Sequence, residues 1–378
     1  MDTIDWESES TDIFVNPKIP EDQRYRLEKR LRGFAIKGHI WLSTSGSSSH
    51  SNISPKWVAL SKQAVLTSAA SVNRHLQVTE TDRWIHTLPY FHVGGLGIYA
   101  RAYLSRSKVL KCSPKWNPKN FQMYCHEYSG TLTALVPTQL YDLVQLNLQA
   151  PTSLRATVIG GGALSDELYQ KGKQLGWKPL PSYGLSECAS QVATAALDSL
   201  RLDVLPQLQV LSHIDDLRIT EEGCLTIRSS SLLSTYAIIV DNECLSEDPK
   251  DNGWFETEDL ASIQGGYLTI HGRKTDIVKV GGENVNIELL NRLLINLCSS
   301  LSTDGEQVLV ALPSERLGHE VHIAECQTTP EQLSSLINCF NSRVLPFERI
   351  KSVHHLEEIP RTELSKIKKQ ILINKCLK

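Results

Sequence analysis

Apolar residues follow two different rhythms along the first half of the chain. From residue 39 to about residue 176, short runs of β-branched and aromatic residues alternate with longer segments whose apolar residues recur every three to four positions. The short runs are typical of strands and the longer segments of amphipathic helices. This alternation predicts an α/β fold with a largely parallel sheet. Strands are expected at residues 39–43, 84–88, 131–136 and 157–159, and helices at residues 22–31, 61–76, 96–104, 138–148 and 166–175.

The pattern changes after about residue 208. As far as residue 271, short apolar runs are separated by turn residues such as Gly265-Gly266, which predicts antiparallel strands appended to the α/β body. The division of the chain is therefore expected to be a large domain over residues 1–271 and a small α+β domain over residues 272–378. In the small domain we expect helices at 286–297 and 330–341, strands at 307–312 and 320–324, and a basic helix from residue 364.

Composition limits what the protein can bind. The 378 residues include 39 Lys and Arg against 42 Asp and Glu, so the formal charge of −3 gives no general reason to bind nucleic acid or anionic lipid. No apolar run approaches the roughly 18–20 residues of a membrane span, and the acidic start is unlike a signal peptide. The 9 cysteines include no C-x-x-C pair, which favours reduced thiols. We expect a cytoplasmic protein with no membrane or nucleic-acid partner.

A run of small hydroxyl residues follows the strand at 39–43. Residues 43–49 read Ser-Thr-Ser-Gly-Ser-Ser-Ser, and Pro55-Lys56 precedes the next helix. Backbone N–H groups and hydroxyls of such a loop can close around phosphate oxygens. A serine-rich loop is by itself more often simply flexible, so this motif gains weight only from others.

A histidine and two glycines precede the helix at 96–104. Gly94 and Gly95 follow His92 and let a helix start approach a ligand closely. Arg101 stands further along, among apolar residues. Its side chain either extends to solvent or supplies a bidentate contact to a buried carboxylate.

Glycines and polar residues follow the strand at 157–159. The run 160–162 is all glycine, at the edge where an open α/β sheet binds ligands. In the later segment 182–187, Tyr183 can stack on a flat base, and Glu187 can hold a divalent cation that bridges phosphates. Either piece taken separately could be an ordinary turn.

Two charged residues complete the set. Asp259 can accept hydrogen bonds from both hydroxyls of a ribose. Lys366 follows the turn at Pro360-Arg361, although lysines near chain ends are usually solvated.

Taken in order, these segments resemble the acyl-adenylate-forming superfamily, which includes acyl-CoA ligases, luciferases and peptide-synthetase adenylation domains. The likeness covers about residues 40–370. Residues 182–191, the spacing from Phe91-His92 to Arg101, and Gly-Gly-Glu-Asn at 281–284 are similar to the 2-succinylbenzoate–CoA ligases of menaquinone and phylloquinone synthesis. The alternative is another aryl- or acyl-CoA ligase.

The resemblance implies a reaction in two steps. A substrate carboxylate attacks the α-phosphate of ATP with Mg²⁺, and coenzyme A then attacks the acyl-adenylate. It implies 2-succinylbenzoate as substrate, its ring carboxylate paired with Arg101, and a small domain that rotates between the steps. For the nucleotide, the resemblance implies pyrophosphate binding by Thr44, Ser45, Gly46, Ser47 and Lys56, and adenine binding by Gly161, Gly162, Tyr183 and Gly184. It also implies that Ser186 and Glu187 bind phosphate and Mg²⁺ and that Asp259 and Arg273 bind the ribose. Substrate binding is implied for His92, Gly94, Gly95 and Ser190, and catalysis for Lys366, Glu187 and His92.

The sequence departs from the superfamily pattern at several positions. Ser49 and Ser365 stand where glycines are usual, and Glu258 replaces the glycine before Asp259, where it could repel the nucleotide. From the resemblance we also expect most of the N-terminal subdomain that usually precedes the phosphate loop to be lacking. One face of the sheet is therefore expected to be exposed or covered by a partner, for example in a homodimer. These departures keep a second alternative open, a non-catalytic paralogue that binds nucleotide.

Overall fold

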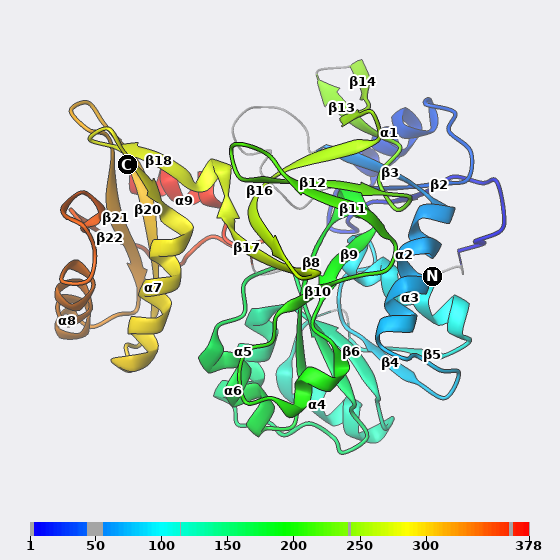
Figure 1. Cartoon of the computed structure of the whole chain (residues 1–378), viewed down its shortest axis with the longest axis horizontal. Helices are drawn as coiled ribbons and strands as arrows, with labels where there is room; N and C mark the ends of the chain where they lie inside the picture. Colours follow the sequence, from blue (N-terminus) through cyan, green and yellow to red (C-terminus); the bar gives the residue numbers. More distant parts are fainter. Residues whose placement is uncertain (1–3, 44–55, 114, 241–242, 363–365, 378) are drawn as a thin grey trace. The chain divides into compact units, whose positions relative to one another are not determined.

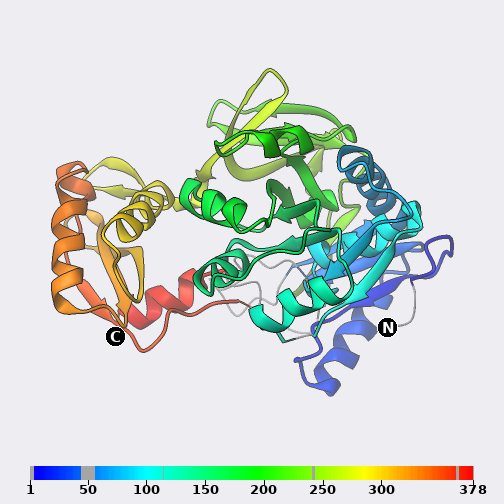
Figure 2. The same cartoon turned by 90° about the horizontal axis from the view of Figure 1, so that it is seen from below.

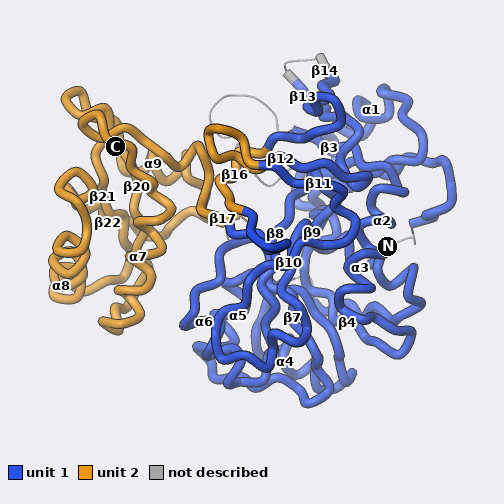
Figure 3. The backbone as a smooth tube through the Cα atoms, viewed as in Figure 1, with its two compact units in different colours: residues 1–218, 226–256, 263–269 blue, residues 219–225, 257–262, 270–378 orange. Residues whose placement is uncertain are grey.

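The computed structural model describes residues 4–43, 56–113, 115–240, 243–362 and 366–377. Its contacts divide the chain into two compact units, which Figure 3 shows in different colours. Unit 1 comprises residues 1–218, 226–256 and 263–269, and unit 2 comprises residues 219–225, 257–262 and 270–378. A functional domain boundary at residue 272, about which a small domain turns, stays a prediction.

A parallel sheet forms the centre of unit 1 (Figure 1). Strands β5, β4, β6, β7 and β8 are hydrogen-bonded in that order, and each adjacent pair is parallel. Strands and helices alternate along the chain, so the predicted α/β fold is confirmed. Strands β6 and β7 are buried along their whole length, as expected for strands covered on both faces. The elements are β4 (Arg83–His86), α3 (Val93–Ser105), β5 (Lys108–Lys111), α4 (Pro118–Glu127), β6 (Leu132–Leu135), α5 (Pro137–Gln145), β7 (Ala156–Ile159), α6 (Asp166–Gln174) and β8 (Pro179–Leu185).

A second sheet of unit 1 corrects one expectation. The sequence pattern predicts residues 39–43 in the parallel sheet, but this strand, β2 (His39–Ser43), pairs antiparallel with β3 (Trp57–Ser61). Strand β3 was not predicted, because a short apolar run that directly precedes a helix cannot be told from the first turn of that helix. The strand order is β1-β2-β3-β13-β14. The other elements here are β1 (Asp12–Phe14), α1 (Glu21–Arg32), α2 (Lys62–His75), β13 (Thr235–Val240) and β14 (Glu243–Glu247).

The antiparallel strands predicted after residue 208 are present. Strand β10 pairs antiparallel with both β9 and β17. Strand β9 pairs antiparallel with β8, so these strands continue the parallel sheet. Strands β13 and β14 form an antiparallel hairpin in the second sheet. The elements of this region are η2 (Ser186–Cys188), β9 (Ser190–Thr194), η3 (Leu197–Arg201), β10 (Leu208–Val210), β11 (Ile214–Ile219), β12 (Cys224–Ser229), β15 (Lys250–Asp251), β16 (Trp254–Gln264) and β17 (Tyr267–Arg273).

Unit 2 is built on the hairpin of β20 (Glu306–Ser314) and β21 (Gly318–Cys326) (Figure 2). Side chains alternate between its two faces. Leu309 and Ile323 pack with apolar residues of α7 (Ile287–Ser300) and α8 (Pro330–Asn341), whereas Val308 and Ala324 pack with α9 (Lys369–Cys376). Helices therefore cover both faces of the hairpin. The remaining elements are η4 (Lys274–Asp276), β18 (Ile277–Val280), β19 (Glu283–Asn286), η5 (Pro346–Glu348) and β22 (Val353–His355).

The last helix begins at Lys369 and not at residue 364 as predicted. Arg361 and Ile367 form an antiparallel bridge, and the N–H of Lys368 donates to the carbonyl of Pro360. The backbone of Ile367 and Lys368 is therefore hydrogen-bonded to that of residues 360–361, and the helix begins only after these residues. None of the helices in the described part of the chain is long and apolar enough to cross a membrane.

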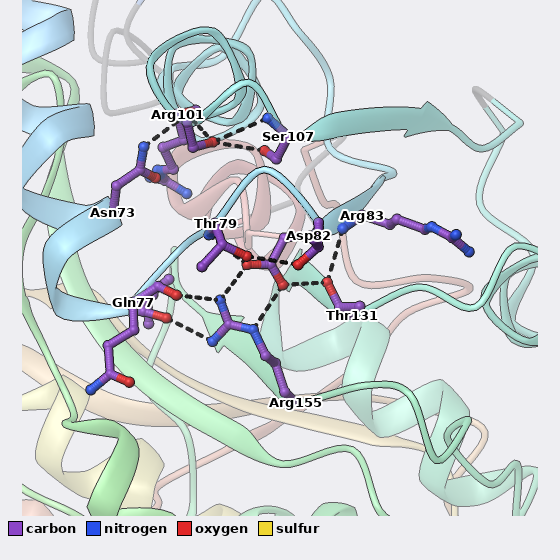
Figure 4. Close-up of polar contacts among 12 residues, drawn as sticks. Asn73, Gln77, Thr79, Asp82, Arg83, Arg101, Ser107, Thr131 and Arg155 are labelled. Carbon is purple, nitrogen blue, oxygen red and sulfur yellow. Dashed lines mark hydrogen bonds and ion pairs between the residues drawn. The ribbon is translucent and has the colours of Figure 1, made fainter.

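An ion pair between the buried Asp82 and the half-buried Arg155, together with the hydroxyl of Thr131, joins the amino ends of three parallel strands (Figure 4). Asp82 precedes β4, Thr131 precedes β6 and Arg155 precedes β7. The Asp82 carboxylate accepts hydrogen bonds from Arg155 Nε at 2.8 Å, Arg155 Nη2 at 2.7 Å and Thr131 Oγ1 at 2.7 Å. Arg155 also donates to the carbonyl of Leu76, just after α2. Burial by itself raises the pKa of Asp82, but the hydrogen bonds from Arg155 and Thr131 outweigh it and hold that pKa below its ordinary value.

We predict that Asp82→Asn lowers the free energy of unfolding by about 1–3 kcal/mol at pH 7, because it leaves the half-buried guanidinium of Arg155 without its charge partner. The folded-state pKa of Asp82 lies below its unfolded value. Its contribution is therefore complete above the unfolded pKa and is lost as the pH falls through the folded one. Urea unfolding should show a constant difference between the wild type and Asp82→Asn from pH 5 to 8 and a smaller one below about pH 4.

The matched control is Asp216→Asn, which removes an exposed carboxylate paired with Arg218. Its effect should stay within about 0.5 kcal/mol. Equal effects of the two substitutions would contradict the structural role given to Asp82.

Candidate active site

The glycine run at 160–162 lies at the carboxyl edge of the parallel sheet. The N–H of Gly160 donates to the carbonyl of Leu135, the last residue of β6. Strands β7 and β8 are paired so that Ile159 lies beside Pro181. The exposed Gly161 and Gly162 follow β7, and Tyr183 lies two residues beyond Pro181 on β8. The four residues expected to line an adenine pocket, Gly161, Gly162, Tyr183 and Gly184, thus lie at two neighbouring strand ends of one sheet.

A tight turn follows Tyr183 and carries Ser186 and Glu187. Strand β8 continues into η2 and returns as β9, with a bulge between Tyr183 and Gly184. A Cβ at Gly184 would lie 2.0 Å from the carbonyl oxygen of Ser190, so this close approach requires glycine. Ser190 itself has a φ of 111°, which marks the turn as strained.

Glu187 is held at both its main chain and its side chain. Its carbonyl accepts from the N–H of Leu233 at 2.7 Å, and its Oε1 accepts from the hydroxyl of Tyr236 at 2.8 Å. Tyr236 was missed by sequence reasoning. It lies 49 positions from Glu187, and no motif links the two. Only the pairing of β13 with β3 brings it here.

Arg101 lies on α3 and is 2% exposed. In Figure 4 the main-chain carbonyl of Arg101 accepts a hydrogen bond from the side chain of Asn73. The guanidinium takes no part in that contact. Nη2 lies 3.5 Å from Ser190 Oγ, Nε has no hydrogen-bond partner, and Cζ lies 5.6 Å from the centre of the Trp84 ring. Burial is the sole cause that lowers the pKa of Arg101, to about 10. Among the described residues no carboxylate forms an ion pair with this buried cation.

His92 and Gly95 lie at the start of α3, where His92 is the N-cap residue. A Cβ at Gly95 would lie 2.2 Å from the carbonyl oxygen of Pro89, so packing of the chain alone requires this glycine. The carbonyl of Gly95 lies 3.2 Å from Nε2 of His86, a buried residue that sequence reasoning also missed. Burial lowers the pKa of His86 to about 4, so its imidazole is neutral at pH 7. Gly94, by contrast, has only an ordinary neighbour contact.

In unit 2, Asp259 and Arg273 are paired, with 3.0 Å between Asp259 Oδ1 and Arg273 Nε. Asp259 is buried on β16, whereas the preceding Glu258 is exposed. Successive side chains of a strand point to opposite faces, so Glu258 does not share the face of Asp259. Steric crowding of a ligand at Asp259 by Glu258 is therefore not expected, and the repulsion of a nucleotide by Glu258 stays a prediction.

Lys366 directly precedes Ile367, which is bridged to Arg361, and lies shortly before α9. Its N–H donates to Thr362 Oγ1 at 3.1 Å, and its carbonyl accepts from the N–H of Thr362 at 2.7 Å. The main chain of Lys366 is therefore fixed within unit 2. Thr44, Ser45, Gly46 and Ser47, the expected pyrophosphate loop, lie outside the described residues. Lys56, at the other end of that segment, is described and exposed.

The fold and this arrangement define a class of protein. Residues 42–237, just over half of the chain, match the family model of AMP-binding enzymes. The chain belongs to the family of AMP-binding enzymes.

Particular members of that family are similar to this chain. The 2-succinylbenzoate–CoA ligase of Bacillus licheniformis is 24% identical over 309 residues, which are 79% of this chain and 63% of that protein. The enzyme of the same name from Bacillus pumilus is 25% identical over 376 residues, which are 96% of this chain and 74% of that protein. The chain thus spans less than two thirds of the length of the first relative.

A solved structure has the same fold. The o-succinylbenzoate CoA synthetase of Bacillus subtilis, in complex with its acyl-adenylate intermediate, matches with a TM-score of 0.73 at 22% identity. The match covers 89% of this chain and 68% of that one.

We predict that Gly184→Ala destabilises the protein by about 1–3 kcal/mol, because the added Cβ forces β8 and β9 apart at the turn that carries Glu187. The control is Gly162→Ala, whose nearest contact would be Pro137 Cγ at 3.5 Å and whose cost should stay within about 0.5 kcal/mol. Thermal unfolding of the two variants measures the difference. Indistinguishable midpoints would show that the turn is not held by this contact.

Proposed function

We propose that this protein is an AMP-forming ligase that joins 2-succinylbenzoate to coenzyme A through an acyl-adenylate, in menaquinone or phylloquinone synthesis. The observation that carries the proposal is the buried guanidinium of Arg101, which has no carboxylate partner among the described residues. Membership of the AMP-binding family and the names of the similar ligases support it.

The charge of Arg101 selects the substrate. A buried cation without a partner is costly, and a bound carboxylate offsets that cost. A substrate with one carboxylate cannot both bind Arg101 and present an acyl group for activation. 2-Succinylbenzoate has two, so its ring carboxylate can pair with Arg101 and accept from Ser190 while the succinyl carboxylate reacts. His92, Gly94 and Gly95, at the start of the same helix, are proposed to line this pocket.

The nucleotide is proposed to bind at the carboxyl edge of the sheet. Gly161, Gly162, Tyr183 and Gly184 would line the adenine, while Ser186 and Glu187 would face the phosphates. Mg²⁺ prefers hard oxygen ligands, and the half-buried carboxylate of Glu187 fits that preference. When bound, the cation would neutralise charge on the phosphates. Lys56 and the segment Thr44, Ser45, Gly46 and Ser47 are proposed to bind the pyrophosphate.

Residues of unit 2 are proposed to act on the same ligand in solution. Asp259, oriented by Arg273, would accept from the ribose hydroxyls. Lys366 would stabilise charge during adenylation and would be withdrawn when the small domain turns about residue 272, which opens the path for coenzyme A. No side chain need act as a nucleophile, because positioning and charge neutralisation suffice for this chemistry.

The proposed substrates support a cytoplasmic location, where ATP and coenzyme A are available. Large apolar side chains are exposed on α4 and α5, among them Met123 and Tyr141. Such a surface would suit a homodimer.

We predict that Arg101→Leu lowers kcat/KM for 2-succinylbenzoate by 10²–10³-fold, because the ring carboxylate loses its charged partner. Pyrophosphate release with ATP, Mg²⁺ and coenzyme A measures this, beside a panel of aromatic monocarboxylic acids, for which no comparable loss is expected. Arg101→Lys keeps the positive charge but loses the planar guanidinium, so its kcat/KM for 2-succinylbenzoate should lie between those of the wild type and Arg101→Leu.

An equal loss on every acid would reject the proposed role of Arg101. Release by the wild type with another acid alone would replace the substrate but keep the chemistry. No release with any acid, from folded protein that binds ATP, would favour a non-catalytic paralogue.

We predict that Lys366→Ala slows the adenylation step by about 10²-fold or more, because one preorganised positive charge is lost. Thioester formation from supplied acyl-adenylate should change little, since Lys366 is withdrawn in that step. Rapid-quench assays of the two steps measure the difference, with the exposed Lys368→Ala as control. Equal slowing of both steps would contradict a role confined to adenylation.

A further inference from the structure

Tyr236 connects two groups that the proposed reaction uses. It lies on β13 and is 6% exposed. Its hydroxyl donates to Glu187 Oε1 at 2.8 Å, and Lys56 Nζ lies 4.8 Å from the centre of its ring. The phenol therefore contacts a carboxylate at its edge and an ammonium at its face.

Backbone pairing fixes this contact. Tyr236 is paired with Val58 across β13 and β3, and Lys56 comes directly before β3. The N–H of Leu233, on the approach to β13, donates to the carbonyl of Glu187. One stretch of chain thus holds the main chain of Glu187 through Leu233 and its side chain through Tyr236.

The hydrogen bond from Tyr236 affects the orientation in which the carboxylate of Glu187 can bind a cation. A hydrogen bond to one carboxylate oxygen restricts the side-chain rotation of Glu187 and orients its other oxygen. The ammonium of Lys56 is attracted by the negative face of the ring and, by withdrawing electron density from it, strengthens donation by the hydroxyl. Partners of this kind typically change metal affinity by about 10–100-fold.

We propose that Tyr236 is a positioning residue for the metal-binding carboxylate: its hydroxyl orients Glu187 toward a divalent cation bound with the nucleotide. The inference rests on the proposed function, because it assumes that Glu187 binds the cation of Mg·ATP. It goes further in assigning a role to a residue that the proposed function does not use.

The test is Tyr236→Phe in the full chain, which removes the hydroxyl and keeps the ring beside Lys56. Mn²⁺ is titrated with a non-reacting ATP analogue present, and free Mn²⁺ is followed by electron paramagnetic resonance. The Kd for Mn²⁺ should rise by about 10–100-fold. Affinity for the analogue in EDTA should not change. Tyr25→Phe, at an exposed position on α1, is the matched control and should match the wild type.

A double-mutant cycle separates positioning from general destabilisation. If Tyr236 acts through Glu187, Tyr236→Phe should add little to the loss of Mn²⁺ affinity that Glu187→Gln causes. This comparison holds even if Tyr236→Phe lowers the unfolding temperature, because each variant is titrated below its own transition. Additive losses would overturn the proposal, as would a Kd for Tyr236→Phe equal to that of the wild type.

The outcomes also distinguish this inference from the proposed function. A wild type that binds Mn²⁺ through Glu187 and Tyr236 but forms no adenylate with any acid would uphold the inference and reject the ligase. A wild type that forms the adenylate while Tyr236→Phe binds Mn²⁺ normally would uphold the ligase and reject the inference.

Discussion

The ion pair between Asp82 and Arg155 is the interaction on which the parallel sheet depends. It joins the amino ends of β4 and β7, and Thr131 adds β6. The buried carboxylate of Asp82 and the half-buried guanidinium of Arg155 satisfy each other, and the guanidinium also donates to the carbonyls of Leu76 and Gln77. With the amino ends aligned, the carboxyl ends of these strands meet at the opposite edge. That edge is where the glycine run and Tyr183 lie.

Arg101 contrasts with Arg155 in this respect. The guanidinium of Arg155 donates hydrogen bonds to a carboxylate and to a backbone carbonyl. Arg101 is more deeply buried, and its guanidinium lies 3.5 Å from the hydroxyl of Ser190 and near the face of the Trp84 ring. Burial depresses the pKa of Arg101 because solvent and counter-charge are both missing. A protein holds such a group at a cost in stability, and a ligand of opposite charge recovers it. The two arginines thus differ in role: Arg155 is satisfied by the fold itself, whereas Arg101 is the residue to which substrate selection is proposed.

The site is also defined by where the chain approaches itself most closely. The turn of β8 and β9 is closed by the contact of Gly184 with Ser190, and Leu233 and Tyr236 hold Glu187 within it. Asp259 owes its burial to the alternation of β16, which turns Glu258 to the other face. Rigid backbone thus orients the polar groups before any ligand binds, which lowers the entropy cost of binding.

The sequence by itself determined the alternating α/β pattern, the antiparallel region and, through the order of its motifs, most of the candidate residues. The spacing of apolar residues indicates whether a segment buries one face as a helix or as a strand, and this can be inferred from a short stretch of sequence. It does not report which strands pair. Only the tertiary structure shows that β2 pairs with β3 outside the parallel sheet. It also shows that the last helix begins at Lys369 and that the hydroxyl of Tyr236 contacts Glu187. Each of these depends on hydrogen bonds between segments distant in sequence, whose partners no local pattern specifies.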